Sequence, residues 1–141
     1  MTVALETSII VNAPRPRVFA AWTTPELMKK WFAPGAMTVP AVEADARPGG
    51  TYSITMKGEN SSPTVAGEYQ EVVQDEKLVF TWGWQGDASA KTLVTVLFRD
   101  AKGGTEVLLK HERFASPESR DRHLQGWDGC LANLATRIGV A

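Results

Sequence analysis

The residues best suited to chemistry in this sequence are His111, His123 and Cys130. Histidine transfers protons near neutral pH because its ordinary pKa is about 6.5. His111 ends an alternating apolar run where another Leu or Val would be expected, so it could act as an acid–base group or orient a polar ligand group. Arg113 follows on the same predicted face and could meet an acidic ligand at a pocket mouth, although we favour an ordinary salt bridge at the rim. For His111, the alternative that we favour is a core histidine satisfied by hydrogen bonds.

Cys130 and His123 are also candidates for a nucleophile and for a metal site. Cys130 would need an adjacent base and a lowered pKa to attack a substrate, and His111 is the candidate base. A buried cysteine more often packs as a small hydrophobic residue. His123 and Cys130 would stand about 10 Å apart along a helix axis at 1.5 Å per residue. One zinc ion with ligands at roughly 2.0–2.3 Å cannot take both. We therefore expect no metal and no cofactor.

The elements that position these residues can be predicted from the spacing of apolar side chains. Residues 5–11 alternate as a strand does, and two short helices follow because Pro25 would break a single long one. Leu27, Met28, Trp31 and Phe32 then keep helical spacing up to Pro34. Short turns imply antiparallel neighbours among six further strands, expected at residues 39–46, 51–57, 64–73, 78–84, 92–99 and 106–114.

A long C-terminal helix begins after Ser116, a good capping residue followed by a proline. Its apolar side chains recur every three or four residues as one stripe. Gly126 and Gly129 lie inside it, and each costs about 1 kcal/mol of helix propensity relative to alanine. A helix that accepts two glycines can let another backbone or a ligand come close.

The predicted order is one strand, two short helices, six strands and one long helix. Seven antiparallel strands have one face to bury and the long helix has one stripe, so the economical α+β fold wraps a curved sheet around the helix. We expect a single domain over residues 1–141.

Composition excludes several classes of function. The formal net charge is −1 with scattered basic residues, which does not suit a nucleic acid partner. No apolar run approaches the ~20 residues that span a bilayer, and the N-terminus does not look like a secretory signal. A single cysteine also favours a cytoplasmic setting. The exposed sheet face and short helices could support a homodimer.

Seven segments in a fixed order carry a resemblance to a known family. They are VNAP at 11–14, VFAAWTTPELMKKWFAP at 18–34, GGTY at 49–52, GEY at 67–69, LVFTW at 78–82, GTEV at 104–107 and HLQGW at 123–127. Together they cover nearly the whole chain. The sequence resembles the START-like (SRPBCC) superfamily with the helix-grip fold, in the branch named for the activator of heat-shock protein 90 ATPase.

This resemblance implies an internal cavity between the sheet and the long helix. We expect it to bind a small hydrophobic, lipid-like or aromatic ligand rather than to catalyse a reaction. The predicted ligand-pocket residues face inward by alternation in the strands, lie near the helix stripe, or, as Trp31 and Met37 do, lie at one end under the short helices. They are Trp31, Met37, Tyr52, Ile54, Met56, Tyr69, Phe80, Trp82, Val96, Phe98, Leu109, His111, Trp127, Cys130 and Leu131.

Two other functions remain as alternatives. One is a cyclase-like or hydrolase-like enzyme in which His111 is the acid–base residue. The other is a chaperone-linked or stress-associated interaction module that works through its outer surface.

Overall fold

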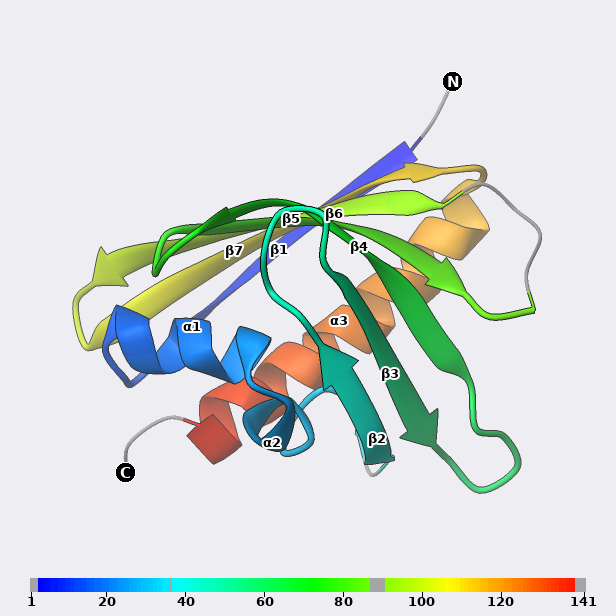
Figure 1. The fold of residues 1–141 in the computed structure, drawn as a ribbon, viewed down its shortest axis with the longest axis horizontal. Coiled ribbons are helices and arrows are strands. Elements are labelled where there is room, and N and C mark those ends of the chain that lie inside the picture. Colours follow the sequence, from blue (N-terminus) through cyan, green and yellow to red (C-terminus); the bar gives the residue numbers. More distant parts are fainter. Residues whose placement is uncertain (1–2, 36, 87–90, 139–141) are drawn as a thin grey trace.

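The chain runs through a strand and two short helices, then six strands, and ends in a long helix (Figure 1). The computed structural model describes residues 3–35, 37–86 and 91–138. The elements are β1 (Val3–Val11), α1 (Arg15–Thr23), α2 (Pro25–Met28), β2 (Thr38–Ala44), β3 (Thr51–Lys57), β4 (Thr64–Val73), β5 (Lys77–Trp84), β6 (Thr92–Ala101), β7 (Gly104–Phe114) and α3 (Pro117–Ile138). This order is the one predicted from the sequence.

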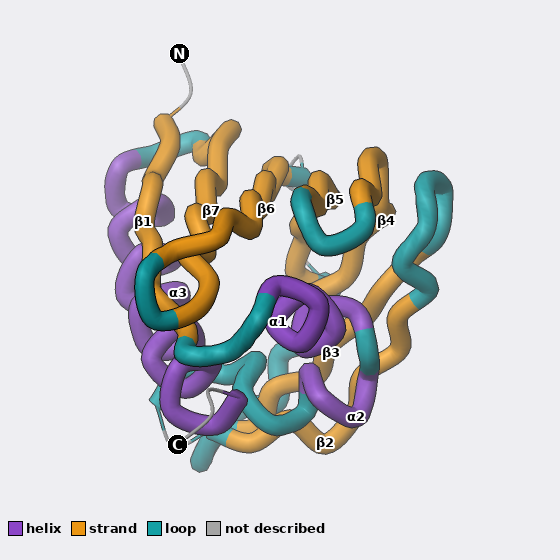
Figure 2. The backbone as a smooth tube through the Cα atoms, turned by 90° about the vertical axis from the view of Figure 1, so that its left-hand side faces the viewer, coloured by secondary structure: helices purple, strands orange, loops and turns teal. Residues whose placement is uncertain are grey.

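All seven strands belong to one antiparallel sheet in the order β1-β7-β6-β5-β4-β3-β2. The first strand therefore pairs with the last, and every other neighbour is joined by a short connection. Figure 2 shows the sheet curling into a half-barrel around the helices. The predicted helix-grip fold is confirmed.

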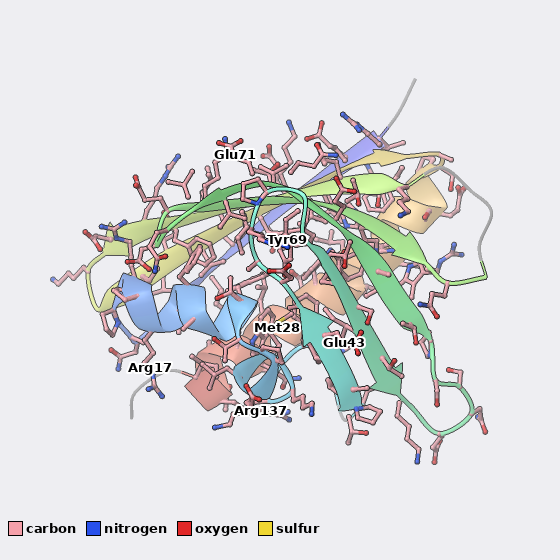
Figure 3. All side chains as sticks on the ribbon, viewed as in Figure 1. Arg17, Met28, Glu43, Tyr69, Glu71 and Arg137 are labelled. Carbon is pink, nitrogen blue, oxygen red and sulfur yellow. The ribbon has the colours of Figure 1, made fainter. Side chains whose placement is uncertain are left out.

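Side chains alternate between the two faces of each strand as the sequence pattern predicts. In β3, Tyr52, Ile54 and Met56 are buried, whereas their neighbours are partly or fully exposed. A bulge in β4 between Tyr69 and Glu71 changes the alternation there. Tyr69 lies under the sheet with Met28, as the alternation from Val65 predicts, whereas Glu71 beyond the bulge lies on the outer face (Figure 3).

The predicted inward position of Arg113 is wrong. The pairing of β1 with β7 shifts between Leu5, opposite His111, and Val3, opposite Phe114. Arg113 occupies this irregularity with a φ of 75°, and its side chain is exposed. Phe114 takes the inward position instead, with its ring centroid 4.3 Å from that of His111.

The second short helix is shorter than its apolar spacing predicts. It ends at Met28 and continues as turns, in which Trp31 N–H donates to the Met28 carbonyl and Ala33 N–H to the Trp31 carbonyl. The adjacent Trp31 and Phe32 lie in these turns and are both buried, at 0% and 2% exposure.

The long helix α3 rests on one side of the half-barrel. It begins with Ser116, whose hydroxyl oxygen accepts a hydrogen bond from Ser119 N–H, the cap predicted from the sequence. Its backbone approaches β1 and, less extensively, β7. No helix within 3–35, 37–86 or 91–138 is long and apolar enough to cross a membrane.

Aromatic side chains fill the end of the half-barrel under α1 and α2. The Trp22 ring centroid lies 4.6 Å from that of Trp31 and 5.7 Å from that of Phe32. The Trp31 indole N–H donates to the Ala21 carbonyl at 2.8 Å. This end of the interior is therefore a packed core.

Candidate functional site

A cavity of about 390 Å³ lies between the first half of α3 and the opposite wall of the half-barrel. We call it the α3 cavity. Its opposite wall consists of Pro34, Met37, Met56, Pro63, Trp82 and Trp84. Its helix wall consists of Ser119, Arg122, His123, Gly126, Trp127 and Cys130. Ligand pockets typically measure about 300–1,000 Å³ and are mostly apolar, as this one is.

The α3 cavity has an apolar floor and a more polar rim. Met56, Trp82, Trp127 and Cys130 are buried and form the floor. Among the described lining residues, Arg122 is the one that is exposed, and the remaining ones are half-buried. The cavity is therefore apolar at depth and open to solvent at its rim.

The two glycines of α3 account for part of this geometry. Gly129 faces the turn before β2, where an added Cβ would come within 3.1 Å of the Pro34 Cβ. At Gly126 an added Cβ would meet nothing within 4 Å, and the position lines the cavity. One glycine thus admits a neighbouring backbone and the other leaves open space.

His111 is fully buried and both of its ring nitrogens are hydrogen-bonded. The Trp127 indole N–H donates to Nδ1 at 3.0 Å, and Thr92 Oγ1 lies 2.6 Å from Nε2. An indole N–H can only donate, so Nδ1 carries no proton and Nε2–H donates to Thr92. The Thr92 hydroxyl in turn donates to the Trp82 carbonyl at 3.1 Å.

This network holds His111 in its neutral form. Burial, with a smaller contribution from the nearby His123, lowers the pKa of His111 to about 3. Protonation at Nδ1 would also break the bond from Trp127. His111 is not among the residues that line the α3 cavity, and its contacts are those of a core histidine whose two nitrogens are satisfied.

His123 forms a second pair with a tryptophan at the cavity wall. The Trp84 indole N–H donates to Nε2 at 3.1 Å, so Nδ1–H donates to the Ser119 carbonyl at 2.8 Å. Burial lowers the pKa of His123, the bond to Ser119 partly opposes this, and the charge of Arg122 lowers the pKa further. This imidazole is also neutral near pH 7.

Cys130 lies on the floor as an unreactive thiol. Burial raises its pKa to about 12, so the nucleophilic thiolate is scarcely populated near neutral pH. The nitrogens of His111 are occupied by Trp127 and Thr92, which leaves no base there for the thiol. Over the part of the chain that the structure describes, no three His, Cys, Asp or Glu residues gather as metal ligands would.

The structure brings five of the predicted pocket residues to the α3 cavity: Met37, Met56, Trp82, Trp127 and Cys130. The other ten are not among its lining residues: Trp31, Tyr52, Ile54, Tyr69, Phe80, Val96, Phe98, Leu109, His111 and Leu131. Four of these border a void of about 10 Å³, room for one water at most, namely Tyr52, Ile54, Tyr69 and Phe80. Their rings contact one another, with the Tyr52 and Phe80 centroids 5.3 Å apart.

Sequence reasoning missed much of the cavity wall. Pro34, Pro63, Trp84, Ser119, Arg122, His123 and Gly126 line it without having been predicted. The helix wall follows spacings of three and four residues from Ser119 to Cys130, which is one face of an α-helix. That periodicity is present in the sequence beside the apolar stripe and could have identified this face.

Solved structures of other proteins share this fold closely. A protein from Chromobacterium violaceum has a TM-score of 0.88 and 22% identity, covering 98% of each chain. An AHSA1 protein from Silicibacter pomeroyi has a TM-score of 0.86 and 25% identity, covering 96% of this chain and 97% of that one. A protein of unknown function from Staphylococcus aureus has a TM-score of 0.81 and 25% identity, covering 98% and 94%. A comparison with curated proteins gives no significant match.

A half-barrel of seven antiparallel strands around a long C-terminal helix, with two short helices after the first strand, defines the START-like helix-grip class of proteins. Within that class, residues 12–139 match the family described as Activator of Hsp90 ATPase homolog 1-like protein. The chain belongs to this family.

Proposed function

We propose that this protein binds a small hydrophobic or aromatic ligand in the α3 cavity. The observation that carries the proposal is an open cavity of about 390 Å³ whose floor is formed by Met56, Trp82, Trp127 and Cys130. Burial of apolar ligand surface stabilises a complex by roughly 25 cal/mol per Å² before the costs of association. Tryptophan and methionine also make favourable contacts with aromatic rings.

The proposed ligand site is smaller than the one predicted from sequence. It keeps the five predicted residues that line the α3 cavity and adds Trp84, His123 and Gly126. Catalysis by His111 is not part of the proposal, because both of its nitrogens are occupied within the core. The function is reversible binding without chemical change of the ligand.

Gly126→Leu tests the proposal by filling the cavity. The added side chain starts in open space on the helix wall, and leucine favours a helix over glycine by roughly 0.8–1 kcal/mol, so the fold should be retained. Binding is measured with the uncharged fluorescent probe N-phenylnaphthylamine and by quenching of tryptophan emission. We expect saturable binding to the wild type and at least about tenfold weaker binding to the variant.

Ala132→Leu is the matched control, because Ala132 lies on α3 but is exposed and outside the cavity. It should bind the probe as the wild type does. The proposal fails if the wild type shows no saturable binding, or if Gly126→Leu binds the probe as tightly as Ala132→Leu.

A further inference from the structure

We infer that the ligand of the α3 cavity is an aromatic monocarboxylate, bound with its carboxylate at Arg122 and its ring against the tryptophan-lined floor. This inference rests on the proposed function and names the chemical class of its ligand. Three observations support it: the one charged side chain on the described wall is Arg122, this side chain lies at the rim above an apolar floor, and its guanidinium has no partner within the described residues.

The charge on the cavity wall is positive and is carried by one residue. Among the described residues that line the cavity there is no aspartate or glutamate, and Arg122 is the one arginine or lysine. His123 is neutral, because its Nε2 accepts the hydrogen bond from Trp84. On the described part of the wall, a ligand therefore meets one cation and no anion, which favours a single negative charge.

The guanidinium of Arg122 is available to a ligand. Among the residues that the structure describes, it forms no ion pair or hydrogen bond, although Glu118 lies one turn before it on α3. Arg120, two residues away, is already paired with Asp121 at 2.9 Å. Arginine binds a carboxylate with two parallel N–H···O bonds, so a carboxylate fits its donor geometry.

The rim offers a further donor beside Arg122. Ser119 lies on the same helix wall, and its hydroxyl is free of partners within the described part of the chain, since its hydrogen bonds use the backbone N–H and carbonyl. A carboxylate bound at Arg122 can therefore also accept a hydrogen bond from the Ser119 hydroxyl. The polar end of the ligand thus belongs at the rim.

The floor requires the other end of the ligand to be uncharged. Met56, Trp82 and Trp127 are buried and apolar, and the raised pKa of Cys130 keeps its thiol neutral. A second carboxylate placed there would lose its hydration without gaining a cation. Arg122 and Cys130 are eight residues apart, about 12 Å along the helix axis at 1.5 Å per residue, which is room for a fused aromatic ring and a short acidic arm.

The experiment compares two probes of similar shape, naphthylacetate and naphthylethanol, which differ in charge. Each displaces bound N-phenylnaphthylamine from the wild type, from Arg122→Gln and from Arg120→Gln. Arg120→Gln removes an equal charge from the same helix at a residue outside the cavity wall, so it controls for long-range attraction. Each protein is checked for an unchanged circular dichroism spectrum.

We expect the wild type to bind naphthylacetate about five- to tenfold more tightly than naphthylethanol, as one exposed, charge-assisted contact should give. The preference should vanish in Arg122→Gln, persist in Arg120→Gln, and shrink at high salt. The inference is overturned if the wild type binds both probes equally, or if Arg120→Gln loses the preference as Arg122→Gln does. Tight binding of the alcohol without a preference, or displacement of N-phenylnaphthylamine by neither probe, would overturn this inference and leave the proposed function standing. Failure of N-phenylnaphthylamine itself to bind the wild type would overturn both.

Discussion

At the scale of single residues, each of the two histidines accepts a hydrogen bond from a tryptophan indole. Trp127 donates to His111 and Trp84 donates to His123. Two other indoles, those of Trp22 and Trp82, are buried with no hydrogen-bond partner among the described residues. A buried donor without a partner costs about 1–3 kcal/mol, so tryptophans of similar burial contribute differently to stability here.

Trp127→Phe and Trp82→Phe separate these contributions. Both residues are buried, at 3% and 5% exposure, and both lie on the cavity floor. Phenylalanine at 127 leaves the buried Nδ1 of His111 without a donor, whereas phenylalanine at 82 removes a donor that had no partner. We expect Trp127→Phe to lower the free energy of unfolding by about 2 kcal/mol more than Trp82→Phe, measured by urea denaturation. Equal losses, or a larger loss at 82, would contradict this account.

At the scale of elements, the sequence predicts the fold because the turn residues and the alternation of apolar side chains indicate the same strands. The bounds of β3 and β4 are those expected from their alternating side chains, and Ser116 caps α3 as expected. The misses occur where tertiary packing overrides a local pattern. An irregularity in the β1–β7 pairing places the Arg113 side chain on the outer face of the sheet instead of the inner one. After Met28 the regular helix gives way to turns, in which Trp31 and Phe32 are both buried.

The two glycines of α3 should respond differently to alanine. Gly126→Ala places a Cβ in open space and should raise the free energy of unfolding by about 1 kcal/mol through helix propensity. Gly129→Ala gains the same propensity but forces a Cβ to 3.1 Å from the Pro34 Cβ, so its net gain should be smaller or negative. Thermal and urea denaturation of both variants measures the difference. A Gly129→Ala variant as stable as Gly126→Ala would show that the turn at Pro34 yields freely.

At the scale of the whole molecule, the position of α3 decides which inward side chains line a cavity. Alternation identifies the inner face of each strand, but Tyr52, Tyr69 and Phe80 on that face close against each other. The helix lies toward β1 and β7, which leaves space beside Trp82 and Trp84. The position of α3 depends on the packing of elements that are distant in sequence, so alternation alone could not locate it. The pocket predicted from the sequence therefore covered the entire inner face of the sheet.

The buried histidines also couple the stability of the whole fold to pH. The pKa of His111 is about 3 in the folded protein and about 6.5 in an unfolded chain. As pH falls below about 6.5, the unfolded chain therefore takes up a proton that the folded protein does not. Stability is lost progressively from there down to the folded pKa, by up to roughly 1.4 kcal/mol per pH unit for this residue. His123, whose pKa is also lowered, acts in the same direction.

His111→Gln should remove this pH dependence while keeping the hydrogen bonds, because an amide can accept from Trp127 and donate to Thr92. Between about pH 6.5 and pH 5, the free energy of unfolding of the variant should fall with a slope smaller by up to roughly 1.4 kcal/mol per pH unit than that of the wild type. Urea denaturation at several pH values measures both slopes. His123→Gln is the comparison, and it should flatten the slope less because His123 is only half-buried. An unchanged slope in His111→Gln would mean that His111 is protonated in the folded protein, contrary to the hydrogen-bond pattern that holds it neutral.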